Sequence, residues 1–218
     1  MIGRFADLAG FIRAKPPGLG AVRVVAVDGP SGSGKTTFTA KLYRALTASG
    51  AKTAVVPVDE LPAETEAVSV WYWLKTCVCD PLERGSPGQY RRYYRWGRTG
   101  PMADHPVKVP VPEVLIVDGV YCSMFTTAVK KALTVVVTAP EPLRLARLIA
   151  VHGEAGRPRV QRWIADENEK FAPARIQTAA DLVIDGAPAT DHDSQLQYVA
   201  VDGLLVRARV KITGEETG

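Results

Sequence analysis

The chain contains few of the residues that build disulfide frameworks or metal clusters. Its 218 residues include three cysteines, Cys77, Cys79 and Cys122, and three widely separated histidines. An odd number of cysteines, with one C-x-C pair and no second pair, supplies neither a disulfide framework nor the four ligands of a structural zinc site. We therefore interpret these cysteines as ordinary thiols.

Long hydrophobic runs are also missing. No stretch approaches the roughly 20 apolar residues that cross a bilayer, and residues 1–15 lack the apolar region and cleavage site of a signal peptide. These absences predict a cytoplasmic protein with no membrane partner. The composition, 46% hydrophobic and 23% charged, is ordinary for a globular protein, and the length predicts a single domain over residues 1–218.

Short apolar runs are present, and they alternate with segments of helical spacing. The apolar runs cover residues 22–27, 53–58, 114–117, 133–138 and 181–184, and the helical segments cover 35–49, 64–84, 142–152 and 158–171. This alternation is typical of parallel βαβ units with right-handed crossovers. We predict an α/β fold with a doubly wound parallel sheet of five strands flanked by helices. The alternating tail, 196–212, predicts an added strand or hairpin.

A glycine-rich segment connects the first apolar run to a helical segment and matches G-x-x-x-x-G-K-[ST]. Glycines allow successive N–H groups to converge on an anion, and the following helix adds the positive end of its dipole. The pattern predicts a P-loop in which Lys35 contacts the β- and γ-phosphates and the Thr36 hydroxyl binds Mg²⁺. The predicted nucleotide-binding residues are Gly29, Ser31, Gly32, Ser33, Gly34, Lys35, Thr36 and Thr37.

Carboxylates follow two of the other apolar runs. Asp118 ends the third run, where a carboxylate in a P-loop protein faces the magnesium ion, although it could instead cap the turn at Gly119. Asp59 and Glu60 end the second run, where ligands of open α/β sheets bind. A carboxylate there could accept the proton of an acceptor hydroxyl or cap the next helix, and Asp59 is the better candidate for the base.

A basic, aromatic segment lies between Arg84 and Lys108. Its residues would suit single-stranded nucleic acid, a small nucleoside or phosphorylated acceptor, or a solvated hairpin. We favour the acceptor, because the P-loop already supplies a use for such contacts, and consider nucleic acid the weaker alternative. The net charge of +4 and the pI of about 9.0 agree with either use.

Taken in order, several of these segments resemble the uridine kinase branch of the P-loop kinases. The segments are Val27–Thr37, Val58–Leu61, Arg91–Tyr93, Leu115–Tyr121 and Ala180–Ile184. The resemblance implies ATP, magnesium and phosphorylation of a hydroxyl on a small acceptor. It implies that Asp59 is the general base, that Asp118 is the acidic partner of magnesium, and that the Tyr90–Trp96 segment lies over the acceptor. It also implies a helical lid, at about residues 144–175, whose arginines close on the phosphates.

Three positions depart from the pattern of this family. Leu61 and Pro62 follow the base where uridine kinases carry an aromatic residue, and Tyr93 is not followed by the Asp and His that help to recognise a pyrimidine. In the lid, Val151 occupies an expected basic position, whereas Arg144 and Arg147, spaced i, i+3, share one helix face. These changes are compatible with kinase chemistry and leave the acceptor open.

The sequence therefore predicts an ATP-dependent kinase for a nucleoside, similar to uridine or cytidine, or for a related metabolite. The alternative is a nucleotide-binding switch or a nucleic-acid-associated P-loop protein, although the chain has no N-K-x-D or L-S-G-G-Q motif. The predicted catalytic residues are Lys35, Asp59, Arg144 and Arg147. The predicted acceptor-binding residues are Asp59, Glu60, Tyr90, Arg92 and Tyr93. The choice of ATP over GTP and a homo-oligomeric state remain open.

Overall fold

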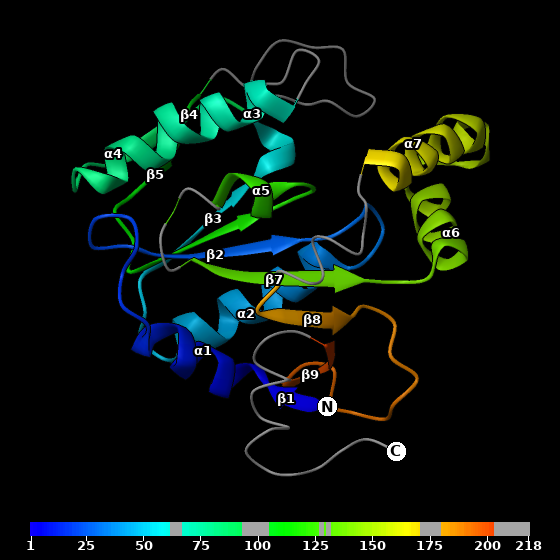
Figure 1. Ribbon diagram of the computed structural model, residues 1–218, viewed down its shortest axis with the longest axis horizontal. Coiled ribbons are helices and arrows are strands. Elements are labelled where there is room, and N and C mark those ends of the chain that lie inside the picture. The colour runs from blue at the N-terminus through cyan, green and yellow to red at the C-terminus, as the bar shows by residue number, and fades with distance from the viewer. Residues whose placement is uncertain (62–66, 93–104, 127–128, 130–131, 171–179, 203–218) are drawn as a thin grey trace.

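A seven-stranded sheet forms the centre of the computed structural model (Figure 1), which describes residues 1–61, 67–92, 105–126, 129, 132–170 and 180–202. The strand order is β1-β9-β8-β7-β2-β6-β3. The five strands from β8 to β3 are parallel, whereas β9 and β1 are added antiparallel at one edge. The strands are β1 Ile2–Arg4, β2 Arg23–Asp28, β3 Thr53–Pro57, β6 Val114–Asp118, β7 Leu133–Thr138, β8 Leu182–Asp185 and β9 Gln197–Asp202.

Helices cover both faces of this sheet. α1 (Phe5–Ala14) and α2 (Lys35–Ala48) lie on one face, and α3 (Ala67–Leu74), the π-helix η2 (Lys75–Cys79) and α4 (Asp80–Glu83) lie on the other (Figure 1). A two-stranded antiparallel sheet, β4 (Gly88–Tyr90) and β5 (Val107–Val109), packs beside the second helical layer. The remaining helical elements are η1 Val58–Glu60, α5 Cys122–Thr126, α6 Glu141–His152, η3 Glu154–Gly156 and α7 Arg157–Lys170.

Strand β2 buries apolar side chains on both faces of the sheet, so helices must cover both faces. Its side chains alternate between two hydrophobic cores, with Val25 and Val27 in the core under α1 and α2, and Val24 and Ala26 in the core under α3 and α4. A strand buried on both faces reads as a continuous apolar run, which is how β2 appears in the sequence. The same alternation places the last residue of the strand, Asp28, inside the protein at 0% exposure.

The structure confirms the predicted α/β fold with its five parallel strands and flanking helices. The tail supplies one strand, β9, as expected, but residues 203–212 of the predicted tail lie outside the described residues. Strand β1 was not predicted, because three residues are too short for a recognisable period. The predicted helix over 64–84 is observed as α3, η2 and α4 from residue 67 onward.

The predicted lid region contains α6 and α7, which lie beyond the carboxyl ends of the strands (Figure 1). Of the predicted lid, residues 171–175 lie outside the described residues. None of the helices described here combines the length and apolar character required to cross a membrane.

Candidate active site

The P-loop begins where β2 ends and finishes at the first residue of α2. Gly29, Gly32 and Gly34 have φ values of 137°, 76° and 107°, which side chains rarely tolerate. A Cβ at Gly29 would also lie 2.1 Å from the carbonyl oxygen of Val137 on the neighbouring strand β7. Glycine is therefore required at these positions for the chain to turn from a central strand into a helix.

Asp28 anchors the start of this loop. Its carboxylate accepts hydrogen bonds from the N–H of Gly29 (2.6 Å), of Tyr121 (2.9 Å) and of Ser123 (3.0 Å), and from the Ser123 hydroxyl. Burial raises the pKa of Asp28, and the bonds from Ser123 and Gly29 oppose that rise. The sequence analysis missed this role. The carboxylate connects the P-loop to the turn after β6 and so holds two parts of the site together.

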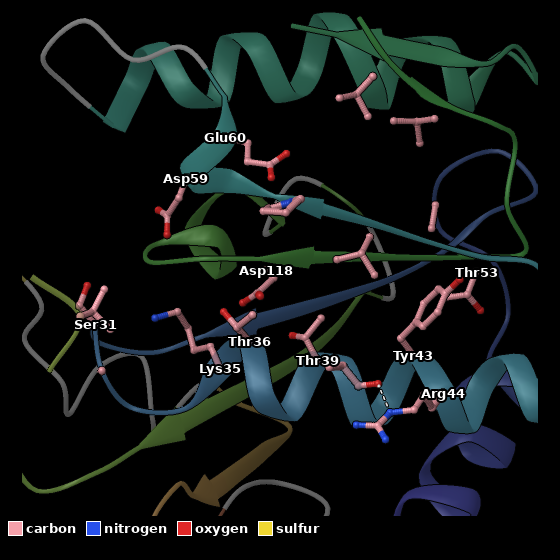
Figure 2. Close-up of a pocket in the computed structure, with 18 of the residues that line it drawn as sticks. Ser31, Lys35, Thr36, Thr39, Tyr43, Arg44, Thr53, Asp59, Glu60 and Asp118 are labelled. Atoms are coloured by element: carbon pink, nitrogen blue, oxygen red, sulfur yellow. Dashed lines mark hydrogen bonds between the residues drawn. The ribbon is translucent and has the colours of Figure 1, made fainter. Parts of the chain in front are cut away.

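Four predicted site residues converge at the carboxyl ends of β2, β3 and β6. Figure 2 shows Asp59 and Asp118 facing Lys35 and Thr36 at the first turn of α2. All four line one cavity of about 1140 Å³. The Lys35 side chain is buried, and its Nζ donates to the carbonyl oxygen of Pro30 at 3.1 Å. A phosphate chain in the loop would therefore lie between a lysine and two carboxylates.

Asp118 has the properties of a magnesium ligand. It is 6% exposed, and within the described part of the chain its buried Oδ1 atom has no hydrogen-bond partner. Burial raises its pKa to about 6; the charge of Lys35 lowers the pKa, and the charge of Asp59 raises it further. A cation would satisfy the Oδ1 atom and restore the ionised form.

The donor set around Asp118 also fits magnesium. Mg²⁺ prefers oxygen ligands and is usually held by one or two carboxylates together with substrate phosphates and water. The Thr36 hydroxyl and the Asp118 carboxylate supply such oxygens from adjacent elements. The described residues contain no cluster of three or more His, Cys, Asp or Glu side chains arranged for a metal.

Glu60, which follows β3, connects the end of that strand by hydrogen bonds to Tyr90 of the two-stranded sheet and to Arg92. Its Oε2 atom accepts hydrogen bonds from the Tyr90 hydroxyl (3.2 Å) and from Arg92 Nε (2.7 Å). Burial, followed by the charge of Glu60, raises the pKa of Tyr90. The structure thus brings three of the predicted acceptor-binding residues together beside Asp59, whereas Tyr93 lies outside the described residues.

A second cavity, of about 780 Å³, also borders the P-loop and shares Gly32, Lys35 and Thr36 with the first. Its wall includes Gly34, Thr37 and Arg147, together with Gly186 and Pro188 from the segment after β8. Gly186 approaches the loop so closely that a Cβ there would lie 1.9 Å from the carbonyl oxygen of Ser33. The P-loop and the first turn of α2 therefore border two cavities.

The predicted lid arginines both contact the P-loop backbone. Arg144 Nε donates to the carbonyl oxygen of Ser31 at 2.8 Å, and Arg147 Nη1 donates to those of Gly32 (3.0 Å) and Ser33 (3.3 Å). Glu167 of α7, which the sequence analysis missed, accepts from the Ser31 N–H at 2.9 Å and from its hydroxyl.

A sequence signal for Glu167 exists in α7. The side chains of Val160, Ile164 and Glu167 are 1%, 3% and 5% exposed, so the carboxylate continues a buried stripe at helical spacing. A charged residue in such a stripe is rare unless it is paired. The spacing of Glu167 from Val160 and Ile164 is visible in the sequence, whereas its burial and its partners are seen in the structure.

Solved structures resemble this chain in fold, whereas comparisons of sequence find no match. No protein-family model matches the chain, and no curated protein sequence matches it. With a protein from Silicibacter sp. TM1040, provisionally named a fructose transport system kinase, the chain shares 23% identity and a TM-score of 0.56 over 75% of this chain and 92% of that chain. The two proteins therefore share their fold.

A second solved structure gives the same result. With a protein from Bacillus stearothermophilus, provisionally named a uridine kinase, the chain shares 20% identity and a TM-score of 0.54, over 82% of this chain and 96% of that chain. The shared fold thus extends over most of both proteins, and the predicted resemblance to the uridine kinase branch is confirmed as a likeness of fold.

Proposed function

We propose that the protein is a magnesium-dependent kinase that transfers the γ-phosphate of ATP to a hydroxyl of a small molecule. The observation that carries this proposal is the convergence of Lys35, Thr36, Asp118 and Asp59 on one cavity. In a P-loop kinase fold these residues supply the phosphate cation, two oxygens for the metal and a carboxylate base. A switch protein without an acceptor needs no such base.

Each residue has one task in the proposed reaction. Lys35 and the loop amides stabilise the charge of the transferring phosphoryl group, which passes through a loose transition state. Thr36 and Asp118 would hold magnesium, which would neutralise negative charge on the phosphates. Asp59, on the other side of the cavity, orients the acceptor hydroxyl and accepts its proton.

The two cavities are assigned to the two substrates. The cavity that contains Asp59 takes the acceptor, because that carboxylate is the candidate base. The cavity beside Thr37, Arg147 and Gly186 takes the base and ribose of the nucleotide, since it borders the P-loop and the first turn of α2 but does not contain Asp59. The P-loop then holds the phosphates between them.

The proposed acceptor is a nucleoside or a related polyhydroxyl metabolite. The connection of Glu60 to Tyr90 and Arg92 supplies a polar wall next to Asp59. The two structural neighbours carry the names of kinases for uridine and for fructose transport, and both names fit hydroxyl-bearing acceptors. Recognition of uridine itself has less support, since the sequence lacks the pyrimidine-recognising pattern of that family.

The deciding experiment is a screen of ATP consumption across nucleosides, sugars and vitamin precursors in the presence of Mg²⁺. We expect one class of acceptor to stimulate turnover in the wild-type protein and not in the Asp59→Asn variant. If the protein binds Mg-ATP but no acceptor stimulates its hydrolysis or transfer, the kinase proposal fails in favour of a switch. Steeply salt-dependent binding of single-stranded nucleic acid would instead support the nucleic-acid alternative.

A further inference from the structure

The outer side of the P-loop is held by side chains from both lid helices. The peptide carbonyls of Ser31, Gly32 and Ser33 accept hydrogen bonds from the two arginines of α6. Arg147 also donates from Nη2 to the carbonyl oxygen of Gly186 at 3.0 Å. Three consecutive carbonyls of the loop are thereby satisfied by guanidinium groups, which present several donors in a rigid, planar arrangement.

Glu167 completes the same contact from α7. Its carboxylate accepts both donors of Ser31, the N–H and the hydroxyl, and it also accepts from Arg144 Nη2 at 3.2 Å. Ser31 is thus bonded through its carbonyl, its N–H and its hydroxyl to one buried ion pair. The Arg144 and Glu167 side chains are 5% and 6% exposed, so water screens these bonds little.

The side of the loop that these residues contact determines what they can do. A peptide group has its donor and its acceptor at opposite ends, so a carbonyl that points out of the loop belongs to an N–H that points the other way. The carbonyls of Ser31 and Ser33 belong to the peptide groups that carry the N–H of Gly32 and Gly34. A cation on such a carbonyl polarises the peptide group and strengthens the opposite N–H as a donor.

We propose that Arg144, Arg147 and Glu167 are positioning residues that hold the P-loop, from its outer side, in its phosphate-binding conformation. The two lid arginines then act on the phosphates through the peptide groups of the loop instead of by direct contact. This inference rests on the proposed function, because it assumes that the loop binds nucleotide phosphates.

The first test compares Glu167→Gln with Glu169→Gln, an exposed carboxylate on the same helix. The amide in Glu167→Gln cannot accept all three of the bonds described above, because its NH₂ group only donates. We expect this variant to bind pyrophosphate and Mg-ATP about tenfold more weakly by calorimetry, the effect of losing one hydrogen bond to a charged group. The KM for ATP should rise more than kcat falls, whereas Glu169→Gln should match the wild type.

Pyrophosphate locates the defect, because it has no base or ribose and can report only on the phosphate site. Equal affinity for pyrophosphate in the variant and the wild type would overturn the proposal. Tighter binding in the variant would also overturn it and would show that the carboxylate competes with phosphate. If the wild type itself binds neither pyrophosphate nor Mg-ATP, the proposed function fails as well.

A second pair of variants keeps the test valid if Glu167→Gln does not fold. Arg147→Lys retains the positive charge, but an ammonium group cannot reach the carbonyls of Gly32, Ser33 and Gly186 together. Arg162→Lys, an exposed position on α7, is the matched control. Weaker pyrophosphate binding in Arg147→Lys alone would support the positioning role, and unchanged binding in both would contradict it.

Discussion

Arg144 of α6 and Glu167 of α7 form a buried ion pair, with 3.2 Å between Nη2 and Oε2, at the contact between the lid helices and the P-loop. Burial lowers the pKa of Arg144, and the charges of Glu167 and Glu141 oppose that effect. The pair therefore couples the stability of the lid to the stability of the nucleotide site.

The consequence for stability can be measured by removing one or both charges. Arg144→Met leaves the Glu167 carboxylate buried without its cation, which should lower the free energy of unfolding by about 3 kcal/mol. Arg144→Met combined with Glu167→Leu removes both charges and should recover much of that loss. Urea unfolding followed by circular dichroism measures both variants. An equal loss in the single and double variants would contradict a buried ion pair.

Lys35 is expected to be essential for turnover. Its side chain is buried in the loop, and no other position supplies a cation from the P-loop itself. Lys35→Ala should reduce kcat/KM for ATP by at least about a hundredfold, since a charge aimed at the transferring phosphoryl group is lost. Lys52→Ala, at an exposed position before β3, serves as the control and should retain full activity. Similar activity in the two variants would exclude this role of Lys35.

Asp59 is expected to act on the chemical step and not on nucleotide binding. Asp59→Asn retains the shape of the side chain but cannot accept the acceptor proton, so kcat should fall by about a hundredfold or more. The dissociation constant for ATP should change little. Steady-state kinetics and calorimetry separate the two effects. A variant that keeps the wild-type kcat would show that Asp59 is not the base.

The ionised carboxylate of Asp118 is expected to lower the free energy of unfolding of the metal-free protein and to be necessary for activity. Its folded-state pKa of about 6 lies above the ordinary value of 3.8, so between these pH values the folded protein binds the extra proton. Without metal, the free energy of unfolding should therefore decrease as pH rises through that window. Asp118→Asn removes the ionised form and should stabilise the metal-free protein at pH 7, by up to about 3 kcal/mol.

The same variant should lose the response to magnesium. Thermal unfolding of the wild type should shift upward with Mg-ATP, whereas Asp118→Asn should show a much smaller shift and little turnover. In the wild type, kcat/KM for Mg-ATP should decline as pH falls below about 6, the pKa of Asp118 in the metal-free protein, because the proton must leave before the metal binds. Full activity of Asp118→Asn would refute the assignment of this carboxylate to the metal.

The local patterns in the chain were sufficient to nominate residues that the structure brings together around one cavity. The P-loop is encoded by eight consecutive residues, Gly29 to Thr36, because its glycines, lysine and threonine each have a backbone or ligand role that needs no distant partner. Asp59 and Asp118 could be proposed because they end apolar runs, and the carboxyl ends of parallel strands meet at one edge of a sheet. The arrangement in Figure 2 agrees with this reasoning.

Other features depend on contacts between residues far apart in the chain. The Arg144 and Arg147 pair was predicted from the family resemblance together with its helical spacing, but neither specifies which side of the P-loop a helix packs against. Ser31 and Glu167 are separated by 136 positions, and Asp28 and Ser123 by 95. Such contacts follow from the packing of whole elements around the sheet, because hydrophobic burial decides where each helix lies and the buried polar groups must then find partners. The sequence by itself thus determined the P-loop and the strands that end in Asp59 and Asp118. Only the tertiary structure decided that Arg144, Arg147 and Glu167 of the two lid helices bind the backbone of that loop.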